Sequence, residues 1–190
     1  MIERIIARLG IWNGWLLMSV FIWHMIVIMT GGKAIAERTH ISDPEKEPGF
    51  ERNVHMIGNL LALCLLIYSI FLPLRTGTTL LIIGLILYAA GVIILALATY
   101  TFMRTPLDII IDSGVYRISR HPMYLSSFLI WVGVGLAVHS WIFLLVTAVM
   151  FFVFHREALL EERICQKVYG EEYSIYMYRI PRWIGLPRSK

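Results

Sequence analysis

The sequence contains few charged residues: they make up only 16% of its 190 positions, whereas a soluble domain has about 25%. Hydrophobic residues make up 58%, compared with roughly 45–50% in soluble domains. A soluble domain of this length would leave much of that apolar surface in water, whereas a lipid bilayer accommodates it. The composition therefore excludes a single water-soluble domain and predicts an integral membrane protein.

Cysteine is also scarce. Cys64 lies in an apolar stretch and Cys165 in a polar one, and this pair provides neither a disulfide framework nor the spacing of a metal site. The formal net charge of +4 does not indicate nucleic-acid binding, because the basic residues flank apolar segments and form no run of their own. We expect membrane lipids as partners, and neither a metal nor a nucleic acid.

Long apolar runs are abundant. Three of them, residues 11–30, 56–74 and 78–100, have about the 20 residues that a bilayer-spanning helix needs. The first follows two arginines, as in a signal peptide, but it is longer than the usual apolar core of one, so we interpret it as a transmembrane helix. A fourth run, residues 123–154, is interrupted only by a His-Ser pair and predicts a tight helical hairpin.

The expected fold is therefore an all-α integral membrane protein with about five transmembrane helices. It would form a single membrane domain over residues 1–190, with the first three spans and a loop in residues 1–100 and the motif region in residues 101–190. The charged segment 31–55 is predicted to be a loop with a surface helix. Residues 155–190 are predicted to form a cytosolic helical C-terminal tail rich in polar and aromatic residues.

The basic residues predict an orientation in the membrane. Five spans place the N-terminus and the turns at Arg75 and His139 on one side, and the other polar segments on the opposite side. The first side carries 3 basic residues: Arg4, Arg8 and Arg75. The second side carries 14: Lys33, Arg38, Lys46, Arg52, Arg104, Arg117, Arg120, Arg156, Arg163, Lys167, Arg179, Arg182, Arg188 and Lys190. By the positive-inside rule, the N-terminus is outside, and the long loops and the C-terminus are cytosolic.

The predicted spans lack Asp, Glu, Lys and Arg in their interiors, where only His24 and Asn59 are notably polar. Pumps and ion-coupled transporters usually need ionisable groups inside the membrane. Transport is therefore disfavoured, and chemistry is expected at the cytosolic edge of the membrane.

Two clusters of polar and aromatic residues could provide that chemistry. The first is Gly114 to Tyr124, with the sequence GVYRISRHPMY; on composition alone, a turn with membrane-edge arginines and tyrosines explains it better than an active site. The second is His155 to Arg163, which continues the hairpin helix. Glu157 and Glu161 share one face of that helix, so a cation nearby would stabilise them, although a solvated amphipathic helix explains this cluster equally well.

Together, the two clusters form a longer pattern: G-V-Y-x-x-x-R-H-P-x-Y, an apolar hairpin, E-E, then Y-G-E-E-Y-x-x-Y and a proline. Over residues 108–187 this resembles the isoprenylcysteine carboxyl methyltransferase family and the related phospholipid N-methyltransferases. The resemblance implies that S-adenosylmethionine is bound by Asp108, Ile109, Ile110, Ile111, Tyr116, His121, Pro122, Met123, Tyr124 and Glu161, the first four through their backbone. It also implies that Arg156 meets the substrate, with Glu157 as the rival for that role.

These residue types suit the methyl donor. His121 and Arg120 could bind its carboxylate, Glu161 its ammonium or ribose, and the tyrosines its adenine and sulfonium. Methyl transfer is a direct displacement that depends on alignment and desolvation, so it requires no nucleophilic Ser or Cys. Gly133 and Gly135 lie inside an apolar span, where helix packing explains them better than a glycine-rich nucleotide turn.

Several functions stay open at this point. Arg156 favours O-methylation of the carboxylate of a prenylated cysteine, and this is the reaction that we expect from the sequence. The alternative is N-methylation of a lipid amine such as that of phosphatidylethanolamine, which the Glu157/Glu161 pair permits. A nicotinamide-dependent membrane reductase is more remote, because the chain is short for the sterol reductases that share a loosely similar C-terminal region. In a non-enzymatic membrane protein, both clusters would only anchor the helices at the membrane edge.

Overall fold

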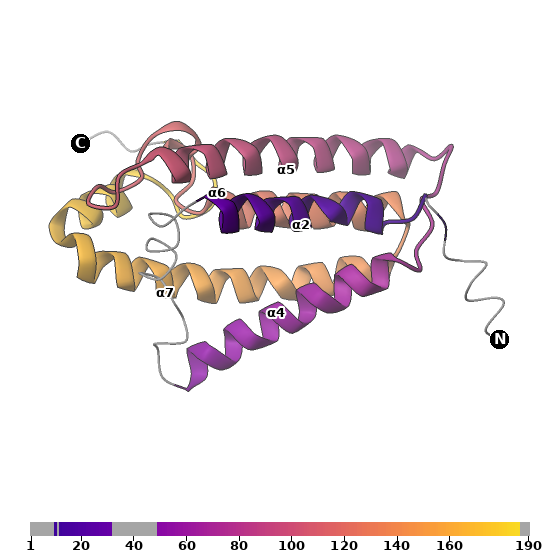
Figure 1. Cartoon of the computed structure of the whole chain (residues 1–190), viewed down its shortest axis with the longest axis horizontal. Helices are drawn as coiled ribbons and strands as arrows, with labels where there is room; N and C mark the ends of the chain where they lie inside the picture. Colours follow the sequence, from indigo (N-terminus) through magenta and orange to yellow (C-terminus); the bar gives the residue numbers. More distant parts are fainter. Residues whose placement is uncertain (1–9, 11, 32–48, 187–190) are drawn as a thin grey trace.

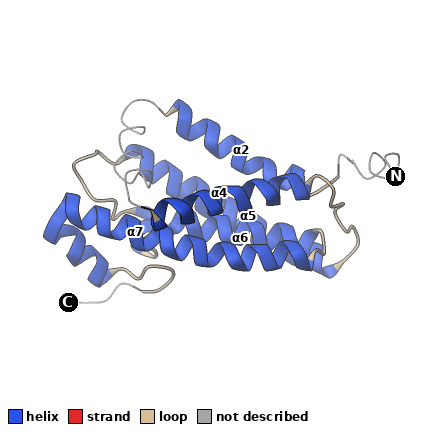
Figure 2. Cartoon of the chain, turned by 90° about the horizontal axis from the view of Figure 1, so that it is seen from below, coloured by secondary structure: helices blue, strands red, loops and turns tan. Residues whose placement is uncertain are grey.

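The computed structural model describes residue 10, residues 12–31 and residues 49–186. In chain order, the described elements are α2 (Trp15–Thr30), α4 (Phe50–Ser69), α5 (Thr79–Arg104), the 3-10 helix η2 (Gly114–Arg117), α6 (Pro122–Ala137) and α7 (Trp141–Arg179). These parts of the chain contain no β-strand (Figure 2). The predicted all-α fold is therefore confirmed.

Three helices, α4, α5 and α7, are long and apolar enough to cross a membrane, and α2 and α6 are shorter apolar helices. Large apolar side chains such as Ile82, Ile86 and Ile93 project outward from α5. Such a surface is costly in water but matches the hydrocarbon core of a bilayer. These features are those of a membrane protein.

The helices form an elongated bundle in which α5, α6 and the apolar part of α7 run along the long axis, whereas α4 is inclined to it in Figure 1 and α2 in Figure 2. Glycines allow α5 and α6 to approach closely. A Cβ atom added to Gly84 would lie 2.6 Å from the carbonyl oxygen of Gly133, and a Cβ atom added to Gly133 would lie 2.6 Å from the carbonyl oxygen of Gly84. Small residues at such contacts are typical of membrane helices. The structure thus confirms the packing role predicted for Gly133.

A tight turn joins α6 to α7, as the sequence predicts. Its central residue, His139, has a φ of 54°, and Ser140 caps α7 by accepting a 3.2 Å hydrogen bond from the backbone N–H of Phe143. Backbone N–H groups in the first turn of a helix have no carbonyl partner within the helix, and the Ser140 hydroxyl oxygen serves as the acceptor for one of them. The hairpin consists of the short helix α6 and the much longer helix α7.

Several helices extend beyond the apolar runs. Helix α4 begins at Phe50 rather than at residue 56, and α7 continues through the polar tail to Arg179 with a bend at Gly170, whose φ is 60°. Hydropathy marks the apolar length of a helix and cannot detect polar turns that continue it. Of the surface helix predicted within residues 31–55, residues 32–48 lie outside the described part of the chain.

The two ends of the bundle are formed by different segments of the chain. At one end, the backbone N–H of Arg75 donates to the carbonyl of Ala137, and Thr78 contacts His139 at 3.1 Å, so the two short turns meet. At the opposite end lie residues 105–121 and the polar part of α7 (Figure 1). This arrangement brings both motif clusters to one end of the bundle.

Candidate active site

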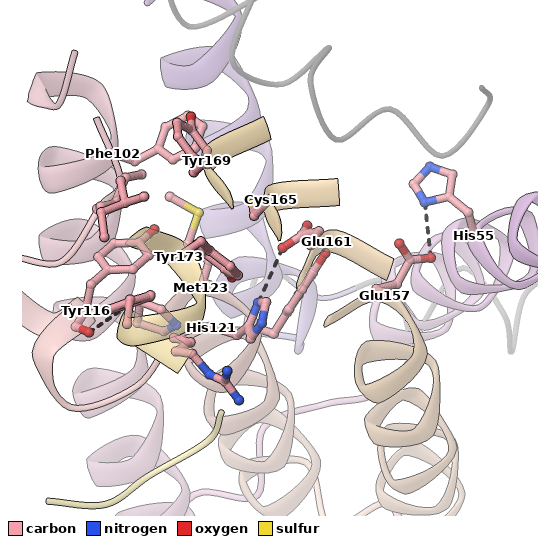
Figure 3. Close-up of a pocket in the computed structure, with 16 residues that line it drawn as sticks. His55, Phe102, Tyr116, His121, Met123, Glu157, Glu161, Cys165, Tyr169 and Tyr173 are labelled. Atoms are coloured by element: carbon pink, nitrogen blue, oxygen red, sulfur yellow. Dashed lines mark hydrogen bonds and ion pairs between the residues drawn. The ribbon is translucent and has the colours of Figure 1, made fainter. Parts of the chain in front are cut away.

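A cavity of about 390 Å³ lies at the end of the bundle where the two motif clusters meet (Figure 3). Its volume falls within the usual range for small-molecule pockets, about 300–1,000 Å³. Helices α4, α5, α6 and α7 and the segment 105–121 all contribute to its wall. The lining residues are His55, Phe102, Ile110, Ile111, Tyr116, Arg120, His121, Pro122, Met123, Tyr124, Glu157, Glu161, Cys165, Tyr169, Tyr173 and Tyr176.

Most residues expected to bind the donor lie in this wall. They are Ile110, Ile111, Tyr116, His121, Pro122, Met123, Tyr124 and Glu161. Asp108 and Ile109 are exposed and do not line the cavity. The fold therefore gathers the residues of both clusters around one space, whereas their binding roles remain predictions.

The two candidates for the substrate contact are placed differently. Glu157 lines the cavity and is buried. Arg156 does not line it: its guanidinium lies over the ring of Phe50 at 5.2 Å and 4.0 Å from Glu51. Arg156 and Glu157 instead share a small pocket beside the main cavity. Of the two, only Glu157 can reach the interior in this arrangement.

His121 lies at the centre of the polar wall, just before the first residue of α6. Its Nδ1 is 3.3 Å from Glu161 and its Nε2 is 3.2 Å from Glu162. Burial lowers the pKa of this histidine, but hydrogen bonds to the two carboxylates outweigh burial, so the pKa is raised. The geometry thus suits an imidazolium that donates from both nitrogens.

Glu161 accepts from two sides. The hydroxyl of Tyr124 donates a 2.5 Å hydrogen bond to one of its oxygens, while His121 faces the other. The Tyr124 ring is sandwiched between the rings of His121 and Phe154, at centroid distances of 5.7 and 4.9 Å. About a third of the Glu161 side chain stays exposed, so this carboxylate can also meet a ligand in the cavity.

Glu162 is the main site residue that sequence reasoning missed. Arg182 binds both of its oxygens, at 2.9 and 2.6 Å, and Arg120 lies 3.1 Å away. Burial raises the pKa of Glu162, but hydrogen bonds from Arg182 and His121 and the charge of Arg120 lower it to about 2. The only sequence signal was its place in the E-E pair, which did not reveal these partners.

Arg120 lines the cavity with part of its hydrogen-bonding capacity unused. Only 8% of its side chain is exposed, and among the described residues no acceptor reaches its Nε or Nη1. A buried cationic donor without an acceptor costs free energy. These two nitrogens are themselves buried, so they do not face the open part of the cavity in this arrangement.

On the opposite side of the cavity, His55 of α4 faces Glu157 of α7 (Figure 3). Nδ1 of His55 is 3.3 Å from the Glu157 carboxylate. Burial raises the pKa of Glu157; His55 lowers it and Glu161 raises it, and the net shift is upward. No sequence pattern singles out His55, because the predicted first loop ends at this residue.

Aromatic side chains form the rest of the wall and connect the polar part of α7 to the preceding loop. Tyr176 donates to the carbonyl of Tyr116 at 2.9 Å, and Tyr169 donates to the carbonyl of Leu107 at 3.0 Å. Such rings offer flat surfaces for a planar group and electron-rich faces for a cation. Among the residues that the structure describes, no cluster of His, Cys, Asp or Glu could hold a metal ion.

Comparison with known proteins gives one family. The sequence profile described as phospholipid methyltransferase matches residues 75–172, just over half of the chain. The match includes both motif clusters and most of the cavity wall, but His55 and Arg182 lie outside it. No curated protein matches the chain at a significant level.

Proposed function

The chain belongs to the phospholipid methyltransferase family, and on that premise we propose that it transfers a methyl group from S-adenosylmethionine to the amine of a phospholipid head group. The family makes it a membrane methyltransferase rather than a reductase or a non-enzymatic membrane protein. The observation that carries the choice of an amine is the buried Glu157 carboxylate, which lines the cavity and contacts His55.

The cavity residues fit the donor. The positive charge of Arg120, which lines the cavity, would attract the donor's carboxylate. Glu161 would bind its ammonium or ribose hydroxyls, and the tyrosine rings would face its adenine and its sulfonium. The volume of about 390 Å³ is in the range for a ligand of this size.

The reaction requires alignment more than covalent catalysis. S-adenosylmethionine supplies an electrophilic methyl group: the acceptor nitrogen bonds to the methyl carbon, while the carbon–sulfur bond breaks and its electron pair stays on sulfur. The chain's contribution is to hold both reactants in line and to exclude water. No side chain has to become a covalent intermediate.

An amine acceptor must lose a proton before its lone pair can attack. The Glu157 carboxylate would attract the ammonium form and accept its proton, and burial, which raises the pKa of Glu157, favours the protonated product. His55 contacts this carboxylate through Nδ1, while its Nε2 faces Nδ2 of Asn59 at 3.0 Å. Glu157 is thus proposed as the catalytic base and His55 as the residue that holds it in place.

The carboxylate of a prenylated cysteine is a second candidate acceptor. Arg156 supports it, because this cation is the neighbour of Glu157 in the chain and lines a small pocket beside the cavity. A carboxylate is already ionised at neutral pH and needs a cation instead of a base. It is ranked second because the Arg156 side chain points to Glu51 and Phe50 and does not line the main cavity.

We further propose that the cavity end of the bundle faces the cytosol. The described residues at that end include Arg52, Arg104, Arg117, Arg156 and Arg163, whereas Arg75 is the described arginine of the opposite turns. An excess of arginine is typical of the cytosolic side.

Transfer of a radiolabelled methyl group to defined lipids tests the proposal. Purified protein in proteoliposomes should label phosphatidylethanolamine, and Glu157→Gln should remove most of that activity at neutral pH. The matched control is Glu172→Gln, which alters an exposed glutamate away from the cavity wall. Labelling of a prenylcysteine analogue in place of the phospholipid would favour the second candidate, and failure to bind the donor would overturn the proposal.

A further inference from the structure

A polar residue of α4 that the proposed site does not use contacts one of the histidines of that site. Asn59 is one of the two notably polar residues inside the predicted spans, and it follows His55 by one helical turn. Its amide nitrogen Nδ2 lies 3.0 Å from Nε2 of His55. Asn59 is exposed on the surface of α4, where a bilayer offers an amide few hydrogen-bond partners. His55 is therefore the partner that satisfies this amide.

The contact with Asn59 fixes the position of the proton on the His55 ring. An amide nitrogen carries hydrogens and is a donor only, so Nδ2 of Asn59 donates and Nε2 of His55 accepts. A neutral imidazole that accepts at one nitrogen carries its proton on the other nitrogen. His55 is therefore held as the tautomer with its proton on Nδ1.

The protonated nitrogen of His55 is the one that faces the proposed base. Nδ1 of His55 lies 3.3 Å from Oε1 of Glu157 on α7 (Figure 3), so it donates to this carboxylate. The hydrogen bonds thus run in one direction, from Asn59 to His55 and from His55 to Glu157. Glu157, the last member, receives a hydrogen bond and keeps its negative charge.

The opposite tautomer of His55 would have the opposite effect on Glu157. With the proton on Nε2, the lone pair of Nδ1 would face the carboxylate, and two acceptors in contact repel each other unless one of them gains a proton. Glu157 would then be favoured in its protonated form, which donates to Nδ1. A protonated Glu157 cannot accept a proton from a substrate ammonium group. The tautomer of His55 therefore decides whether the proposed base is in its active form.

We propose that Asn59 is a positioning residue: its amide holds His55 in the tautomer that donates from Nδ1, and His55 in turn keeps the Glu157 carboxylate ionised and ready to accept the proton of the lipid amine. The inference rests on the proposed function, in which Glu157 is the base. It concerns the acceptor side of the site and gives Asn59 no role in binding the methyl donor. Asn59 and His55 both lie outside the segment that matches the family.

The test compares the methylation of phosphatidylethanolamine by variants of the full-length protein in proteoliposomes. Asn59→Leu removes the amide with little change in side-chain volume and should lower kcat about tenfold at neutral pH, the effect of one lost hydrogen bond. Asn59→Gln keeps an amide and should recover part of the rate. Asn53→Leu is the matched control, because it removes an exposed amide from the same helix, and it should leave kcat within about twofold.

The pH profile separates positioning from a structural role. The loss of rate in Asn59→Leu should be largest at low pH and should shrink at high pH, where the amine loses its proton without help from the base. Asn59→Leu leaves the other ionisable groups around Glu157 unchanged: Glu161, Tyr124, Glu51 and Arg156. A purely structural role of Asn59 would lower the rate by the same factor at every pH.

Two further measurements test whether Asn59 acts through the histidine. In a His55→Phe background, Asn59→Leu should cause no further loss of rate, and calorimetric titration should give equal affinities of wild type and Asn59→Leu for S-adenosylmethionine. A loss that is independent of pH, a further loss in the His55→Phe background, weakened donor binding or a wild-type rate in Asn59→Leu would overturn the inference. If the wild-type protein does not methylate phosphatidylethanolamine, or if Glu157→Gln is fully active, the proposed function itself fails.

Discussion

The hydroxyl of Tyr124 lies 2.5 Å from a carboxylate oxygen of Glu161, although 37 residues separate the two in the chain. Tyr124 is in the first turn of α6, and Glu161 is on the polar part of α7, beyond the hairpin. The turn between α6 and α7 folds the chain so that both motif clusters return to the same end of the bundle. This contact makes the two clusters one site.

The first prediction concerns Glu161. Glu161→Gln removes the negative charge that is proposed to bind the donor, so it should weaken S-adenosylmethionine binding roughly 10- to 100-fold, the range for a lost hydrogen bond to a charged group. Calorimetric titration measures this. Glu171→Gln, an exposed glutamate on the same helix, serves as the control, and equal affinities for the two variants would refute a role for Glu161.

The second prediction is a pH dependence of stability that arises from His121. Its pKa is raised above the ordinary value of 6.5 in the folded protein. Its stabilising contribution should therefore be fully present below pH 6.5, the pKa of an unperturbed histidine. That contribution should be lost as the pH rises through the raised pKa of His121 in the folded protein. The difference in thermal midpoint between wild type and His121→Gln should shrink from pH 6 to pH 9. A constant difference would mean that His121 does not act as a cation.

The third prediction concerns helix packing. A methyl group added at Gly133 would lie 2.6 Å from the carbonyl oxygen of Gly84 and 2.7 Å from the backbone nitrogen of Tyr88. Since backbone atoms cannot easily move away, Gly133→Ala should destabilise the protein by about 1–3 kcal/mol. Gly58→Ala is the comparison, because its nearest neighbour is a side-chain methyl group of Val153 at 2.7 Å and not a backbone atom. Thermal unfolding in detergent should show the larger loss for Gly133→Ala.

The fourth prediction concerns orientation. Cysteines introduced at the exposed positions Arg117 and Lys167 should resist a membrane-impermeant thiol reagent in intact cells and react after the membrane is opened. A cysteine at Thr76, in the turn at the opposite end, should react from outside. Wild-type protein provides the background from Cys64 and Cys165. The reverse pattern would show that the cavity end faces outward.

The sequence predicts the features that depend on neighbouring residues and misses those that depend on contacts between residues far apart in the chain. The apolar length of a helix depends only on consecutive residues. The sequence pattern therefore predicts the runs around α2, α4 and α5 and the 123–154 hairpin. The ends of α4 and α7 were not predicted, because hydropathy does not detect the polar turns that continue a helix beyond its apolar length. His55 and Arg182 were missed for a different reason: each acquires its place only when distant helices pack.

The final prediction distinguishes the two acceptors by the pH dependence of the methylation rate. A primary amine has a pKa of about 10.4, like lysine, so almost all of it is protonated at neutral pH. Its methylation rate should rise by up to about tenfold per pH unit wherever deprotonation limits the reaction. A carboxylate with a pKa of about 3.3–3.7 is fully ionised from pH 6 to pH 8 and should give a nearly flat profile.

The proposed base adds a second, sharper expectation. Glu157 contacts His55 at 3.3 Å and lines the cavity, so Glu157→Gln should reduce the rate with phosphatidylethanolamine most strongly at low pH. At high pH the loss should become smaller, because the amine then deprotonates without help from the protein. Arg156→Ala should change this profile little, since Arg156 does not line the cavity. A flat profile together with a raised Michaelis constant for a prenylcysteine analogue in Arg156→Ala would instead establish the carboxylate as the acceptor.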